Sequence, residues 1–147
     1  MAHEQIKGLT VNVKKDFVAL AEYISANTST PFEWGKFDCC LAVADALRAM
    51  TGHDFAESFR GHYASKRGAA MALRRYGQGT IKDTLNHIFG PFKPRLNTGR
   101  GDVVLVHTDI GDALGVCFGG QIWCAAENGL QPLPMRRAIC CWSVSCQ

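Results

Sequence analysis

The first half of the chain places apolar side chains at helical spacing. One stripe, at positions i, i+3, i+4 and i+7, predicts a helix over residues 14–26 and consists of Phe17, Leu20, Ala21 and Ile24. A second helix is expected to begin directly after Asp38, because an Asp side chain accepts hydrogen bonds from the amides of a first turn, and to end at Gly52. Two more helices are predicted over residues 65–76 and from Thr80 to the Gly-Pro pair at 90–91.

After Gly101 the pattern changes to short apolar runs separated by turns. The expected strands cover residues 102–107, 113–118, 121–126, 130–134 and 138–144. A loop of about five residues joins the first two strands, and Gly119-Gly120 forms the next hairpin turn. Helices followed by a meander predict an α+β fold, with N-terminal helices packed on a C-terminal antiparallel sheet of about five strands. We expect one domain over residues 1–147, with residues 1–13 as a loose N-terminal arm.

Composition narrows the function classes. The chain has 147 residues, of which 47% are hydrophobic and 20% charged, as in an ordinary globular domain. Its net charge of +3 includes no dense basic run with interleaved aromatics, so nucleic-acid binding is not expected. No apolar run approaches the roughly 20 residues that span a bilayer. The N-terminus lacks the apolar core of a signal peptide, which predicts synthesis in the cytoplasm without secretion by that route.

Seven cysteines, an odd number, argue against a disulfide framework in a chain without a secretory signal. We expect reduced thiols that pack as small apolar side chains. The alternative is a metal or iron–sulfur site formed by Cys140, Cys141 and Cys146. Their spacing matches no standard metal site, so we expect no cofactor.

Cys39 has the position that a nucleophilic thiol needs. It follows the predicted cap Asp38 and opens an apolar helix, where the amides of the first turn favour a thiolate. Cys40 lies in the same turn but points about 100° away. Helix geometry alone favours the plainer interpretation, a packed thiol. Peptide hydrolysis also needs a base, and among the histidines only His107 falls on a predicted strand.

Three segments together resemble a known family. The segments "WGKFDCCLAVADAL", "GDVVLV" and "ALGVCFGGQIWCA" resemble the NlpC-type cell-wall peptidases, a papain-like superfamily. The chain is also similar to small tailed-phage tail-module proteins that share a Trp-Gly-x-x-Asp-Cys motif. Together the likeness covers roughly residues 14 to 144.

The resemblance implies roles for particular residues. It places the nucleophile at Cys39, with Trp34 and Asp38 shaping the site, and the base position at Ala113. The third, polar position falls near Trp123 or Cys124, and neither side chain can orient an imidazole. His107 is a candidate replacement base, since it stands across the predicted hairpin from Ala113. That role depends on strand register, because a slip of one residue turns the side chain to the other face.

Two functions follow as expectations from the resemblance. The first is a structural or assembly component of a phage tail tip or baseplate, located in the virion, with a degenerate peptidase fold. The second is an active peptidoglycan endopeptidase that uses Cys39 and His107 on cell-wall stem peptides during phage entry. A cytoplasmic papain-fold protein with no virion role stays open. Candidate contacts to other tail proteins are residues 89–100 and 140–147.

Overall fold

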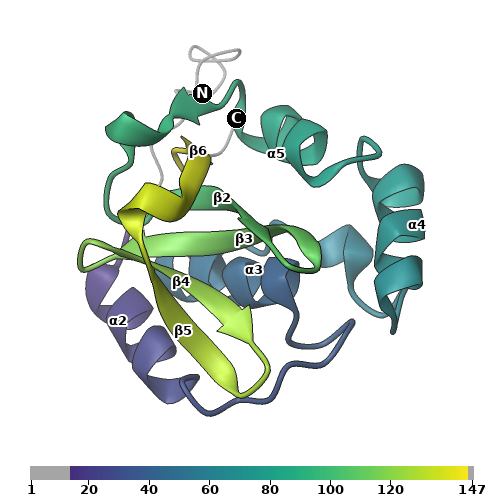
Figure 1. Cartoon of the computed structure of the whole chain (residues 1–147), viewed down its shortest axis with the longest axis horizontal. Helices are drawn as coiled ribbons and strands as arrows, with labels where there is room; N and C mark the ends of the chain where they lie inside the picture. The colour runs from purple at the N-terminus through teal and green to yellow at the C-terminus, as the bar shows by residue number, and fades with distance from the viewer. Residues whose placement is uncertain (1–13, 146–147) are drawn as a thin grey trace, which may run out of the picture.

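Four helices precede an antiparallel sheet in the computed structural model, which describes residues 14–145 (Figure 1). The predicted arm over residues 1–13 lies outside the described residues. The helices are α2 (Phe17–Ala26), α3 (Cys39–Thr51), α4 (Lys66–Tyr76) and α5 (Ile81–Phe89). Three short 3₁₀ helices, η1 (Glu57–Phe59), η2 (Arg95–Asn97) and η3 (Met135–Arg137), lie in the connections.

Each helix begins directly after a polar side chain that accepts a first-turn amide. Asp16, Asp38, Ser65 and Thr80 cap α2, α3, α4 and α5, respectively. The first helix therefore starts at Phe17 rather than at residue 14, because the Asp16 carboxylate takes the Ala19 amide at 2.9 Å. The α3 boundaries agree with the prediction, and Gly52 ends this helix in the left-handed conformation.

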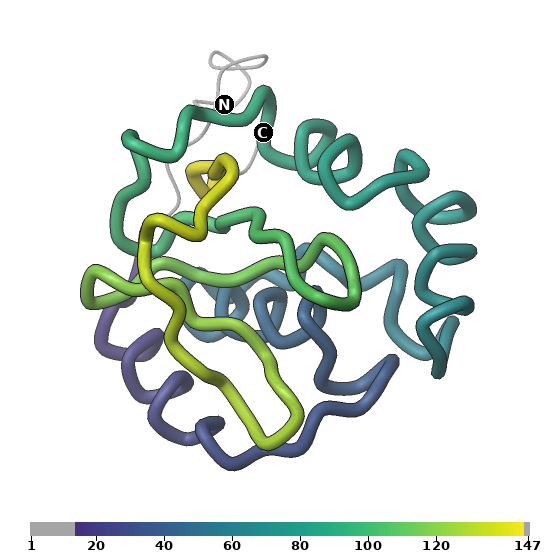
Figure 2. The backbone as a smooth tube through the Cα atoms, viewed as in Figure 1, coloured from purple at the N-terminus to yellow at the C-terminus, as the bar shows by residue number. Residues whose placement is uncertain are grey.

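The sheet has six strands, which are β1 (Lys93–Pro94), β2 (Val103–Thr108), β3 (Gly111–Phe118), β4 (Gln121–Ala126), β5 (Gly129–Pro134) and β6 (Ala138–Trp142). Their order is β1-β6-β2-β3-β4-β5, and every pair is antiparallel. The α+β class is confirmed. The simple meander is corrected: β6 returns to pair with β2, and the two-residue β1 pairs with β6, as the chain trace shows (Figure 2).

The turn between β2 and β3 is shorter than the predicted five-residue loop. Thr108 pairs with Gly111, so that only Asp109 and Ile110 connect the strands. This pairing sets the register of the hairpin: Val106 lies opposite Ala113 and His107 lies opposite Asp112. Glycine is required at position 111, where the backbone φ angle is +110°.

The two faces of the sheet bury different side chains. One face carries large residues that pack against α2, α3 and α5, including Val103, Leu105, Leu114, Val116 and Trp142. The other face carries mostly small or branched residues, and its buried cluster consists of Cys39, Val104, Val106, Ala113, Cys117, Ile122, Cys124, Ala138 and Cys141. In Figure 1, α3 lies against the sheet, whereas α4 lies at the outer edge of the molecule.

Candidate functional site

Asp38 anchors the start of α3. Its carboxylate is 1% exposed and accepts four hydrogen bonds. One oxygen takes the amides of Cys40 at 3.1 Å and Leu41 at 2.9 Å, and the other takes the Gly35 amide at 2.9 Å and the Tyr63 hydroxyl at 2.5 Å. The predicted cap is therefore confirmed, and the same side chain also ties the Trp-Gly turn and the loop before α4 to the helix.

Cys39 begins α3 with its side chain 7% exposed. Its sulfur lies 3.9 Å from that of Cys40, which is half-buried. The hydrogen bond with Cys40 lowers the pKa of the Cys39 thiol, and a backbone hydrogen bond from Leu114 lowers it further, against the opposing effects of burial and of Asp38. The same thiol pair, together with burial, raises the pKa of Cys40 well above its ordinary value. The site therefore favours the thiolate at Cys39 and the thiol at Cys40.

Ala113 and Cys124 share the buried cluster that contains Cys39. Pairing between β3 and β4 stops at Gly115 and Cys124, so residues 111–114 of β3 are paired with β2 but not with β4. Burial raises the pKa of Cys124 to about 12, and the nearby Cys39 raises it as well. Of the positions that the resemblance implied, Cys39, Ala113 and Cys124 therefore share one buried cluster, whereas Trp123, the other candidate for the third position, packs against the cluster on the opposite face.

His107 occupies a different place. It pairs with Asp112 while Ala113 pairs with Val106, and neighbouring residues of a strand point to opposite faces. His107 and Ala113 therefore lie on opposite faces of the sheet. The His107 side chain is 72% exposed, and its Nδ1 lies 3.1 Å from Asp112 Oδ1. His107 does not occupy the position beside Cys39 that Ala113 leaves without an imidazole.

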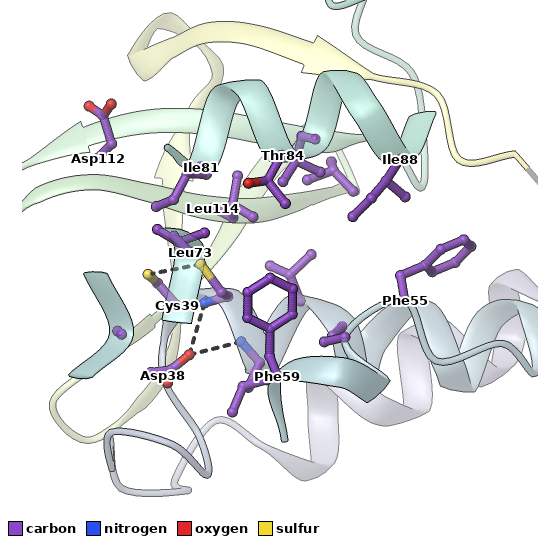
Figure 3. Close-up of a pocket in the computed structure, with 18 of the residues that line it drawn as sticks. Asp38, Cys39, Phe55, Phe59, Leu73, Ile81, Thr84, Ile88, Asp112 and Leu114 are labelled. Atoms are coloured by element: carbon purple, nitrogen blue, oxygen red, sulfur yellow. Dashed lines mark hydrogen bonds between the residues drawn. The ribbon is translucent and has the colours of Figure 1, made fainter. Parts of the chain in front are cut away.

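A largely apolar cavity of about 210 Å³ borders Cys39, and Ala113 is not part of its lining. Helices α3, α4 and α5, the segment from Phe55 to Phe59, and the β2–β3 hairpin line it. Figure 3 shows Asp38 and Cys39 at one end and Phe55 and Ile88 at the other. Trp34, Tyr63, Lys66 and Asp112 add polar groups to the lining, and no histidine of the described residues belongs to it.

The C-terminal cysteines do not form a metal site in the described chain. Cys140 and Cys141 are consecutive in β6 and belong to the clusters on opposite faces of the sheet, so one ion cannot contact both side chains. Cys146 lies outside the described residues. Across residues 14–145, no group of three or more His, Cys, Asp or Glu side chains has the geometry to hold a metal ion.

Sequence reasoning missed three parts of this site. Tyr63 lies 25 residues from Asp38, and no local pattern connects the two side chains. The cavity lies between helices, and how those helices pack against one another cannot be read from local sequence patterns. Asp112 was expected only in a loop, whereas β3 includes it and directs it to the face that carries Leu114.

The comparisons with known proteins give one family. The chain belongs to the family described as a domain of unknown function (DUF6950), whose match covers residues 14–144. A search of the curated proteins finds no match. Within the described residues, each helix is too short or too polar to cross a membrane.

Proposed function

We propose that this protein is a structural or assembly component of a phage tail tip or baseplate, built on a papain-like, NlpC-type fold that has lost its chemistry. One observation supports the loss of chemistry: Ala113 and Cys124, which the resemblance aligns with the base and its orienting group, share the buried cluster of Cys39. A thiolate without an imidazole lacks the acid that a leaving amine needs. The assignment to a phage tail is supported by the sequence resemblance.

The site keeps the features that position α3 and lacks those that move a proton. Asp38 is fully committed to four hydrogen bonds within the chain. Its role is to hold the helix, the Trp-Gly turn and Tyr63 together. A fold retained in this way serves to present surfaces, and residues 89–100 are the proposed contact to other tail proteins. Leu96, 88% exposed, is the most exposed large apolar side chain of this segment.

The predicted contact over residues 140–147 is wrong for its described part, because Cys140, Cys141, Trp142, Val144 and Ser145 are buried. Residues 146–147 lie outside the described residues.

A phage complementation experiment distinguishes the structural role from the enzymatic role. Deletion of the coding sequence should abolish infectious particles, and the Cys39→Ala protein should restore them fully, because assembly does not need the thiol. Mass spectrometry of purified virions should detect the protein. Its absence from virions, or failure of Cys39→Ala to complement although the variant folds and accumulates, would contradict the proposal.

The alternative is an active peptidoglycan endopeptidase in which Cys39 attacks and His107 serves as the base. The His107–Asp112 pair favours it, since a carboxylate on Nδ1 orients an imidazole in the manner of a catalytic triad. Hydrolysis of purified muropeptides by the wild-type protein, lost in both Cys39→Ala and His107→Ala, would establish this activity. No hydrolysis by a folded wild-type protein leaves the structural role.

A further inference from the structure

The cavity beside Cys39 favours an uncharged, apolar occupant. Most of its lining is aliphatic or aromatic, and includes Phe55, Phe59, Leu73, Ile81, Ile88 and Leu114 (Figure 3). The two polar side chains of the lining that are buried, Asp38 and Thr84, have hydrogen bonds within the chain. Asp38 accepts four of them, and the Thr84 hydroxyl has an acceptor at 2.6 Å and a donor at 2.9 Å. Lys66 and Asp112, the other charged side chains of the lining, are exposed to solvent.

Large apolar side chains are left only partly covered around this cavity. Phe55, Phe59, Leu73, Ile81 and Ile88 are half-buried. Contiguous apolar surface of this kind on a chain with an otherwise complete core marks a ligand or interaction site. An engineered apolar cavity of about 150 Å³ accepts benzene, which has six carbons. By the same ratio, a cavity of about 210 Å³ accommodates an apolar group of about eight carbons.

The cavity is covered by a helix that the core holds weakly. Only Ala72 of α4 is buried. Ala69 and Leu73 of this helix line the cavity, while Met71 is 58% exposed and is not part of the lining. A helix with so few buried contacts opens at low free energy, which gives a ligand a route to the cavity.

Acyl transfer from one sulfur to another demands less of a site than peptide hydrolysis does. An amine must be protonated as it leaves, whereas a thiol with a pKa of about 8.5 leaves as the thiolate. Such a transfer needs an attacking thiolate, which the first turn of α3 favours at Cys39, and Cys39 lines the cavity. No histidine of the described residues lines the cavity, so no imidazole activates water against the resulting thioester.

We propose that Cys39 is a site of S-acylation, at which the protein accepts an apolar, medium-chain acyl group from a thioester and holds the acyl chain in the cavity. The Cys39 sulfur attacks the carbonyl carbon of the donor, a new carbon–sulfur bond forms, and the bond from that carbon to the donor sulfur breaks. The donor thiol leaves as the thiolate and takes up the proton that Cys39 released to solvent. Cys39 then carries the acyl group as a neutral thioester, so the product places no new charge beside Asp38.

This inference rests on one part of the proposed function, the absence of a base beside Cys39, and it goes beyond the assembly role. The two are tested separately. Acylation is measured on the purified protein, whereas the assembly role is measured by phage complementation. A Cys39 that accepts no acyl group would overturn the acylation site and leave the assembly role as it stands.

Mass spectrometry of the full chain, incubated with the N-acetylcysteamine thioesters of butanoic, octanoic and dodecanoic acid, measures the transfer. One acyl group should be added per chain, and peptide mass spectrometry should place it on Cys39. Octanoyl should transfer at least about tenfold faster than butanoyl, because its longer chain buries more apolar surface in the cavity. Dodecanoyl should transfer no faster than octanoyl, because the cavity is then full. Octanamide should not react, and the octanoyl adduct should persist after the free thioester has been removed.

Variants of α4 test the role of the cavity. Ala69 is half-buried in the lining one helical turn before Leu73, and Ala69→Trp, which fills the cavity, should slow octanoyl transfer at least about tenfold. Met71→Trp on the same helix is the matched control and should leave the transfer unchanged. Circular dichroism and thermal unfolding show whether both variants fold. Cys39→Ala should gain no acyl group.

Three results would overturn the proposal. The first is transfer to Cys39 no faster than to free N-acetylcysteine at the same pH, or without a preference for octanoyl over butanoyl. This comparison uses the wild-type protein and decides the matter even if Ala69→Trp does not fold. The second is an adduct on Cys40, the other cysteine of the lining within the described residues. The third is steady release of octanoate, which would show that water is activated and would also contradict the proposed loss of chemistry.

Discussion

Helices α3 and α4 border the same cavity but differ in how firmly the fold holds them. In α3, eight of 13 residues are buried, and its first turn is held by a carboxylate with four donors. In α4, one of 11 residues is buried. The comparison teaches that the Cys39 side of the cavity is fixed scaffold, and that any opening or closing of the cavity falls to α4.

The largest effect is expected from Asp38→Ala. The substitution removes the cap of α3 and leaves four hydrogen-bond donors without an acceptor, those of Gly35, Cys40, Leu41 and Tyr63. The free energy of unfolding should therefore fall by about 4 kcal/mol. Urea denaturation measures the loss. Tyr63→Phe removes one of the four bonds and should cost about 1 kcal/mol. Equal losses in the two variants would show that Asp38 does not organise this region.

Paired truncations test the contrast between the helices directly. Leu47 of α3 is 2% exposed and its truncation in Leu47→Ala should cost about 3 kcal/mol. Leu73 of α4 is half-buried, and Leu73→Ala should cost about 1 kcal/mol. Both losses are read from urea denaturation. Amides of α4 should exchange with deuterium before those of α3. A Leu73→Ala loss as large as that of Leu47→Ala would remove the distinction.

The thiol pair gives a prediction about pH. Because the hydrogen bond with Cys40 lowers the pKa of Cys39, alkylation of Cys39 by iodoacetamide should reach half its maximal rate below the pH typical of an unperturbed thiol. In Cys40→Ala the side-chain donor is lost and the midpoint should move to higher pH. Peptide mass spectrometry separates Cys39 from the other cysteines. A midpoint that stays unchanged in Cys40→Ala would contradict the assigned cause.

The smallest effect is expected at the exposed hairpin. His107→Ala removes a surface contact with Asp112 and should change the free energy of unfolding by less than about 0.5 kcal/mol. It should also leave the Cys39 alkylation profile as it is, because His107 lies on the face opposite Ala113. A slower alkylation of Cys39 in this variant would instead connect the imidazole with the thiol and favour the enzymatic alternative.

Local sequence patterns predicted most elements of the fold. The predicted cap at Asp38 gave the start of α3, because a first turn needs acceptors within a few residues. The starts predicted at residues 65 and 80 fall on Ser65 and Thr80, which cap α4 and α5. The strand over residues 121–126 was placed with its observed bounds. The alternation of apolar and polar residues and the turn signals did not predict β1. Its two residues include a proline and form a strand only by pairing with β6. The order of the strands was also missed, since β6 pairs with a strand more than 30 residues earlier.

The sequence by itself determined the start of α3, with a capped first turn that favours a thiolate at Cys39, because those interactions span only a few residues. Only the tertiary structure decided what faces that thiol. A two-residue turn set the hairpin register, which places Ala113 beside Cys39 and turns His107 to the other face. The Tyr63 hydroxyl on Asp38 and the cavity under α4 likewise depend on contacts between segments far apart in the chain, which no local pattern encodes.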